Sequence, residues 1–158
     1  MFRSVIIGLF GVLMLAAAGC QKKNIPNTQI EDNEVNREIV EFCERYRHAV
    51  EDRNTALLMQ LASQRYFDNA GTPGGDDDYD RAGLEKLLSD QFQSVSALRY
   101  EIRYRDIFQQ NSSIFVEFTY TMSFQYDVDG KSRWHNRTAD KRLELERVDG
   151  RYLIVSGM

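Results

Sequence analysis

Apolar and polar residues alternate without a break from Ile114 to Val128. The even-numbered positions are apolar or aromatic, and from Glu117 onward the odd-numbered positions are polar. Alternation with a period of two is typical of a strand with one buried and one solvated face. Such a strand would reach roughly 50 Å at about 3.3 Å per residue, so it must curl and its concave face needs a cover. The pattern places Met122 and Phe124 in the core.

Three segments that precede this strand are predicted helices that could cover its concave face. Apolar residues recur there at helical spacing in segments 35–50, 57–61 and 84–95. Asp32 or Asn33 can cap the first helix, and Asp78 or Asp80 can cap the third. The glycine-rich stretch 70–75 between the second and third helices predicts a loop.

Period-two alternation also marks residues 98–104, 131–148 and 152–155. Asp129-Gly130 and Asp149-Gly150 are turn sequences that connect antiparallel strands. The predicted fold class is therefore α+β, with three N-terminal helices packed on a curled four-stranded antiparallel meander.

The strand after Asp129-Gly130 contains a conflict of phase. Trp134 occupies an even position, whereas Leu143 and Leu145 occupy odd positions. If all three share one face, a β-bulge must lie near Asn136 to Asp140. If the strand is regular, Trp134 points to the opposite face.

The first residues predict an export signal. Arg3 is followed by an uncharged run from Ser4 to Ala18, which is shorter than a typical membrane span. Ala18-Gly19-Cys20 resembles the lipobox of bacterial lipoproteins. The resemblance implies cleavage after residue 19, acylation of Cys20 and, because Gln21 follows, an outer-membrane destination in a Gram-negative host. An ordinary cleaved signal peptide is the alternative.

The predicted organisation is a signal peptide at 1–19, a lipidated cysteine with a flexible tether at 20–33, and one domain at 34–158. The net charge of −4 argues against nucleic acid as a partner. Cys43 is expected to be a buried, inert thiol. No metal or cofactor is expected, because no ligand pattern surrounds His48 or His135, and the acidic run Asp76 to Asp80 lacks the spacing of a calcium loop.

The order of elements resembles the nuclear transport factor 2-like superfamily. Two local features support the resemblance, the break at Asp52-Arg53-Asn54 and the sequence Asp149-Gly150-Arg151-Tyr152 before the last strand. The superfamily includes ketosteroid isomerases, scytalone dehydratases, polyketide cyclases and many binding domains. Cystatin-like folds, with one helix on a meander, are the nearest alternative.

The resemblance also implies candidate catalytic residues. Isomerases of this group use a tyrosine on the first helix, an acid after the second helix and a neutral acid on a later strand. The matching positions are Tyr46, Asp68 and Asp140, with Asn69 an equal alignment for the second. Lys141, rather than Asp140, has the phase of an inward-facing residue, so Asp140 points inward only if a bulge intervenes.

Three functional hypotheses follow. The first is a lipid-anchored periplasmic binding module whose aromatic pocket takes a small hydrophobic ligand. The second is an isomerase- or dehydratase-like enzyme, and the third is an accessory protein that docks on a partner, or on a second copy, through its sheet. The residues expected to line the pocket are Tyr46, Tyr100, Phe118, Tyr120 and Trp134.

Overall fold

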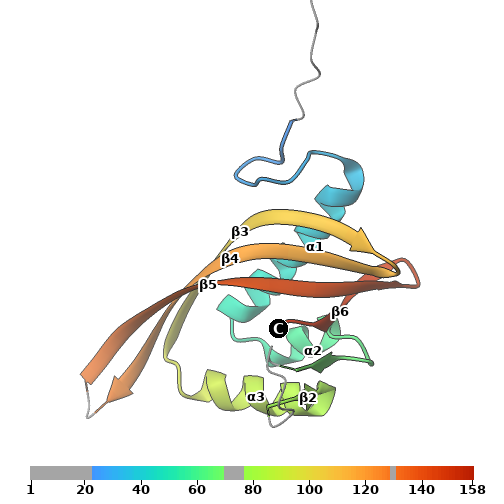
Figure 1. Ribbon diagram of the computed structural model, residues 1–158. Coiled ribbons are helices and arrows are strands. Elements are labelled where there is room, and N and C mark those ends of the chain that lie inside the picture. Colours follow the sequence, from blue (N-terminus) through green and yellow to red (C-terminus); the bar gives the residue numbers. More distant parts are fainter. Residues whose placement is uncertain (1–22, 70–76, 129–130) are drawn as a thin grey trace, which may run out of the picture.

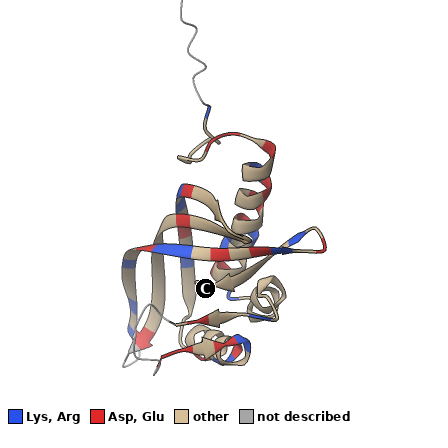
Figure 2. Ribbon diagram, turned by 45° about the vertical axis from the view of Figure 1, so that its right-hand side comes forward, with Lys and Arg blue, Asp and Glu red and all other residues tan. Residues whose placement is uncertain are grey.

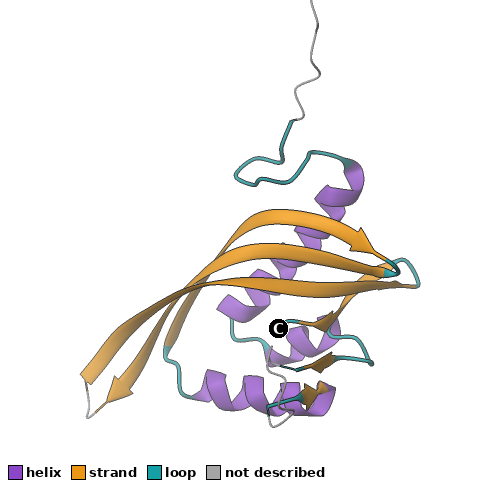
Figure 3. Ribbon diagram, viewed as in Figure 1, coloured by secondary structure: helices purple, strands orange, loops and turns teal. Residues whose placement is uncertain are grey.

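The computed structural model describes residues 23–69, 77–128 and 131–158. Its helices are α1 (Glu34–Glu51), α2 (Thr55–Leu61) and α3 (Arg81–Gln93). The main sheet contains β3 (Ala97–Gln110), β4 (Ser113–Val128), β5 (Lys131–Val148) and β6 (Arg151–Ser156), in the order β3-β4-β5-β6 with every neighbour antiparallel. The predicted α+β meander is confirmed (Figure 3).

The structure also contains a small second sheet of two strands. It pairs β1 (Phe67–Asp68) with β2 (Tyr79–Asp80), two segments that the sequence pattern did not predict as strands. Strands of two residues are too short to show any alternation.

The main sheet curls around the helices (Figure 1). α1 packs against β3, and α2 contacts both α1 and β6. The ends of β4 and β5 near Val128 and Lys131 project beyond the helices. The concave face is therefore covered over most of its length but not at this end.

Side-chain caps begin the helices as the sequence indicated. Asn33 accepts a hydrogen bond from the Asn36 N–H at 2.9 Å, and Asp80 accepts one from the Gly83 N–H at 2.9 Å. These contacts satisfy backbone donors that have no partner within a helix. Asp149 and Gly150 have positive φ values of 50° and 77°, as a tight hairpin turn between β5 and β6 requires. Asp129-Gly130, Asp76 and the predicted signal, including Cys20, lie outside the described residues.

The pairing of β4 with β5 resolves the conflict of phase. Its register runs without a shift from Ile114 opposite Leu145 to Val128 opposite Lys131. Of the two alternatives that the sequence left open, the bulge near Asn136 to Asp140 is therefore excluded and the regular strand is confirmed. The bulges lie elsewhere, at Arg105 in β3 and near the end of the β5–β6 pairing.

The core is built from the inward positions of the sheet and the apolar stripes of the helices. Phe118 and Leu143 are fully buried at its centre, and Cys43 is buried as expected. Phe124, however, is only half-buried and contacts Tyr126 and His135 instead of the core. The prediction that Phe124 is core is wrong because its part of β4 extends past the helices.

Residues 23–33 do not behave as the free tether that the sequence suggested. Asn24 and Glu31 form a bridge, and the Gln29 N–H donates to the Tyr104 carbonyl at 3.2 Å. Ile30 is buried in the core. This apolar residue fixes the loop against the sheet, so the described chain is anchored to the domain from residue 23 onward.

The outer face of the sheet carries interleaved charges (Figure 2). Arg142 pairs with Glu117 at 2.5 Å, and Arg105 pairs with Asp140 at 2.8 Å. The first pair joins the neighbouring strands β5 and β4, and the second reaches across β4 from β3 to β5. Both lie on the solvated face, where each contributes little to the free energy of folding.

Candidate functional site

The regular register of β5 places Lys141 on the concave face of the sheet. Lys141 lies opposite Phe118 on β4, which is fully buried. It shares its face with Leu143, two residues along the strand, which is also buried. A lysine in this position is unusual because an ammonium group loses hydration when apolar groups surround it.

This environment changes the acidity of Lys141. Burial lowers the pKa of the Lys141 ammonium from 10.5 to about 8, the Asp68 carboxylate opposes the shift, and Arg137 adds to it. Among residues 23–69, 77–128 and 131–158, the ammonium forms no hydrogen bond or ion pair. Lys141 is thus a half-buried cation, and the Asp68 carboxylate favours its charged form through space.

Asp68 lies at the end of β1, where hydrogen bonds hold its carboxylate. It accepts hydrogen bonds from the Gly157 N–H at 2.7 Å and from the Tyr66 hydroxyl at 3.2 Å. The Tyr66 ring stacks on Tyr79, with 6.1 Å between centroids. The Tyr66 hydroxyl in turn accepts from the Met158 N–H at 3.1 Å, so β1, β2 and the residues after β6 meet at one polar cluster.

Gly157 allows the backbone to reach Asp68. Its φ is +93°, and a Cβ added there would lie 2.0 Å from the backbone oxygen of Arg142. The segment after β6 therefore lies directly against the backbone of β5, next to Lys141 in sequence. No other residue type fits this approach without a shift of the chain.

Gly157→Ala should destabilise the protein by about 2 kcal/mol more than Gly150→Ala. Both glycines have positive φ, so both variants carry the backbone strain of alanine in that region. Only Gly157 has a clash, since an added Cβ at Gly150 meets nothing within 4 Å. Urea unfolding of the two variants measures the difference, and equal losses would contradict the close approach described here.

The predicted aromatic residues gather between α1 and the sheet. The Tyr46 and Tyr100 rings meet edge to face at 6.2 Å, and Tyr100 and Tyr120 lie 5.4 Å apart. Phe118 packs against Tyr104 at 6.3 Å. Tyr46, Tyr100, Phe118 and Tyr120 are all buried. None of these residues lines the groove described below, so their role in holding a ligand stays a prediction.

The tyrosine hydroxyls in this region are kept protonated. Burial raises the pKa of Tyr46 well above its ordinary value, and Tyr100 raises it further. Burial also raises the pKa of Tyr100 to about 12, while the hydrogen bond with Tyr46 opposes the shift. At neutral pH these groups are hydrogen-bond donors and not bases.

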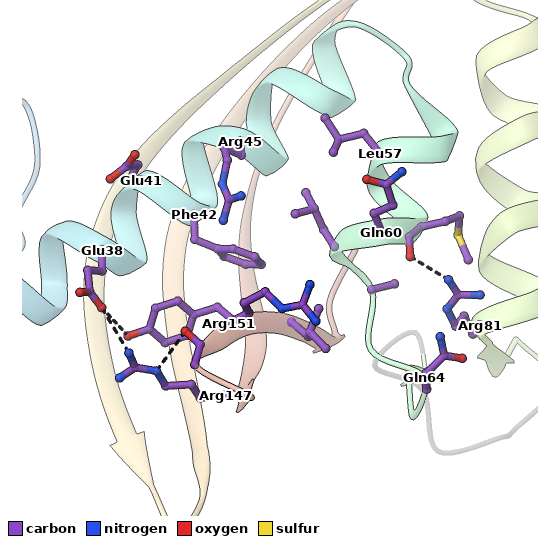
Figure 4. A pocket seen from close by; sticks show the side chains of 16 residues that line it. Glu38, Glu41, Phe42, Arg45, Leu57, Gln60, Gln64, Arg81, Arg147 and Arg151 are labelled. Carbon is purple, nitrogen blue, oxygen red and sulfur yellow. Dashed lines mark hydrogen bonds and ion pairs between the residues drawn. The ribbon is translucent and has the colours of Figure 1, made fainter.

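A groove on another side of the molecule has a volume of about 1030 Å³. It lies between α1, α2 and β6, and Figure 4 shows its side chains. Phe42 and Tyr152 contribute aromatic surface, with 5.9 Å between ring centroids. The arginines that line it are Arg45, Arg81, Arg147 and Arg151, and the acids are Glu38 and Glu41.

Within the described ranges, no cluster of histidine, cysteine and carboxylate groups is suited to a metal ion. In the same ranges, no helix has the length and apolar character needed to cross a membrane.

Comparison with known proteins identifies the fold but not a close relative. No family profile and no curated protein sequence matches this chain. Among solved structures, a conserved protein from Planctomyces limnophilus has a TM-score of 0.65 at 12% identity, over 78% of this chain and 92% of that one. A nuclear transport factor 2-like protein from Salmonella enterica has a TM-score of 0.60 at 15% identity, over 78% and 87%.

A protein from Streptomyces avermitilis, provisionally named a dehydratase of the same family, has a TM-score of 0.61 at 8% identity, over 77% and 92%. The chain has the nuclear transport factor 2-like fold. Identities this low establish the fold alone and carry no function with them.

Within the nuclear transport factor 2-like fold, Tyr46, Asp68 and Asp140 do not converge. Asp140 lies on the outer face, where it accepts hydrogen bonds from Thr119 at 2.7 Å and Arg105 at 2.8 Å. The Thr119 hydrogen bond and then Arg105 lower the pKa of Asp140 below its ordinary value, so it is not a neutral donor. Asp140 could point inward only if a bulge intervened, and the described strand has no bulge there, so Asp140 does not join a catalytic site on the concave face.

Trp134 also lies away from the predicted pocket. It is opposite Gln125 on the solvated face and is 51% exposed. The regular register excludes it from the face that carries Phe118 and Leu143.

The sequence did not indicate Tyr66 or Tyr79 as members of the polar cluster, and it gave Lys141 only a position of inward phase on its strand. Tyr66 and Tyr79 lie beside loop sequence with no periodicity, so nothing indicated that they meet. Lys141 showed the inward phase, and that signal was sufficient to find it.

Proposed function

We propose that this protein is a lipid-anchored binding module of the bacterial cell envelope. Its domain would hold a small, largely apolar ligand with an anionic head against the concave face of the sheet. The observation that supports this proposal is Lys141, a half-buried ammonium on the concave face that forms no hydrogen bond or ion pair within the described residues.

The surroundings of Lys141 agree with such a ligand. Half-buried apolar side chains, among them Ile102, Met122 and Ala139, adjoin the core around this face. An anionic head would add a direct ion pair to the through-space attraction of Asp68, and burial would strengthen that ion pair. Asp68 would fix the polar end of the site through its contacts with Tyr66 and Gly157.

Matched ten-carbon probes test the binding proposal. We expect decanoate to bind measurably in calorimetric titration, whereas decylamine, with a cationic head, should not. Lys141→Met should weaken decanoate binding about tenfold or more, because a charge-assisted contact is lost. Lys131→Met, on the exposed start of the same strand, is the control and should have no effect. Equal binding of both probes, or equal loss in both variants, would contradict the proposal.

The membrane anchor is a separate part of the proposal and rests on the sequence alone. Acyl chains on Cys20 would each contribute about 0.8 kcal/mol per buried methylene, and two or more chains anchor a protein stably. Cys20→Ala should move the protein from the membrane fraction to the soluble fraction and remove the acyl mass from the intact protein. An unmodified wild-type mass would refute the anchor without affecting the binding proposal.

The enzyme alternative with Tyr46, Asp68 and Asp140 is not favoured. Asp140 lies on the opposite face from the other two residues, so the three cannot act on one ligand. The third hypothesis, a protein that docks on a partner through its sheet, stays a prediction.

A further inference from the structure

The groove between α1, α2 and β6 collects positive charge in a chain whose net charge is −4. The lining contains four arginines and two glutamates, namely Arg45, Arg81, Arg147, Arg151, Glu38 and Glu41. Its surface is thus opposite in sign to the protein as a whole. Electrostatic complementarity favours a partner with carboxylates at this place.

Arg45 and Arg151 form no ion pair within the described residues, so their guanidinium groups can bind carboxylates of a partner. Arg147 pairs with Glu38 at 3.9 Å, but in the described part of the chain neither Arg45 nor Arg151 has a carboxylate within ion-pair distance. The Arg45 guanidinium lies over the Phe42 ring at 5.4 Å, which fixes its position. Figure 4 shows Arg45 and Arg151 directed into the groove from α1 and β6.

The edge of β6 offers backbone groups to the same groove. β6 is the last strand of the sheet, and among the residues that the structure describes, Ile154 alone is bridged on its outer side, by Ala62. The Ser63 N–H donates to the Ile154 carbonyl at 2.8 Å, so the backbone groups of Ile154 face outward. Because these directions alternate along an antiparallel strand, the N–H and C=O of Tyr152 face outward too.

Nothing in the described residues pairs with the outward backbone groups of Tyr152. Gly150, Arg151, Tyr152 and Leu153 all line the groove. An unpaired strand edge is a template for an extended segment, with backbone hydrogen bonds giving affinity and side-chain contacts giving specificity.

We propose that the groove binds an extended acidic segment of a protein partner, which adds to the edge of β6 beside Tyr152. Side chains alternate along such a segment, so acids at every second position would face the arginines. Carboxylates would contact Arg45 and Arg151, whose guanidinium groups suit this geometry. This site is independent of Lys141, which lies on the concave face of the sheet.

Labelled peptides test the proposal by fluorescence anisotropy at physiological ionic strength. The probe is a peptide of alternating glutamate and threonine. The first comparison is the same peptide with alternate amides methylated on nitrogen, which retains the charge but cannot pair as a strand. The second is a peptide of alternating lysine and threonine. We expect saturable binding of the first peptide only.

The protein variants separate the groove from the rest of the surface. Arg45→Gln combined with Arg151→Gln should weaken binding of the acidic peptide about tenfold or more. Arg99→Gln combined with Arg133→Gln removes the same charge from exposed positions on β3 and β5 and should change binding by less than about twofold.

Four results would overturn the proposal. They are no binding of the acidic peptide, equal binding of the methylated peptide, equal losses in the two double variants, and a homodimer that dissociates only in the groove variant. The last result would assign the groove to a second copy of this chain.

Discussion

Replacing Lys141 with methionine should stabilise the protein by about 3 kcal/mol below pH 8, and the gain should vanish near pH 10.5. The folded protein holds the pKa of Lys141 at about 8, whereas the unfolded chain has the ordinary value of 10.5. Between these pH values the unfolded state binds more protons, so the wild type gains stability as the pH rises. Methionine has no charge to bury, so the variant lacks this pH dependence.

Urea unfolding of both proteins between pH 7 and pH 10.5 measures the effect, with Lys131→Met as the control. Lys131 is exposed, so its replacement should leave stability unchanged over this range. A destabilised Lys141→Met protein would mean that the ammonium has a structural role. A stabilised one would indicate a residue retained at a cost to stability, as binding sites often require.

Truncating Phe118 should have the second large effect, a loss of about 3–5 kcal/mol for Phe118→Ala. Phe118 is fully buried at the centre of β4, between Tyr104 on β3 and Lys141 on β5. Removing the ring leaves a cavity that the surrounding side chains can fill only in part.

Phe124→Ala is the matched control for Phe118→Ala, with the same change on the same face of the same strand. Because Phe124 is half-buried near the projecting end of β4, its loss should cost about 1 kcal/mol. Denaturant melts of the two variants compare them directly. Similar losses would show that the helices cover the full length of the strand, contrary to the structure.

The alternation in β4 was sufficient to predict the meander, because one face of that strand is covered and the other is solvated. The same rule failed at Phe124, since a sequence does not show where the cover ends. At the projecting end of β4 the alternation of apolar and polar residues continues, but no helix packs against the apolar side chains there.

The site was harder to predict for a related reason. Trp134 suggested a bulge only on the assumption that a large aromatic residue must be buried, but it is exposed on a regular strand. Once the bulge is removed, Asp140 turns outward and Lys141 turns inward. Tyr66, Tyr79 and Gly157 meet through tertiary contacts between distant segments, and no local pattern encodes these contacts.

The most direct test of the proposed site is the pKa of Lys141 itself, measured by NMR with lysine labelled at its ε-carbon. The signal is assigned by its absence from Lys141→Met. We expect a pKa of about 8 in the free protein and a higher value when decanoate is bound, since a nearby anion favours the charged form. A free value near 10.5, or a value that saturating decanoate leaves unchanged, would contradict Lys141 as the group that binds an anionic head.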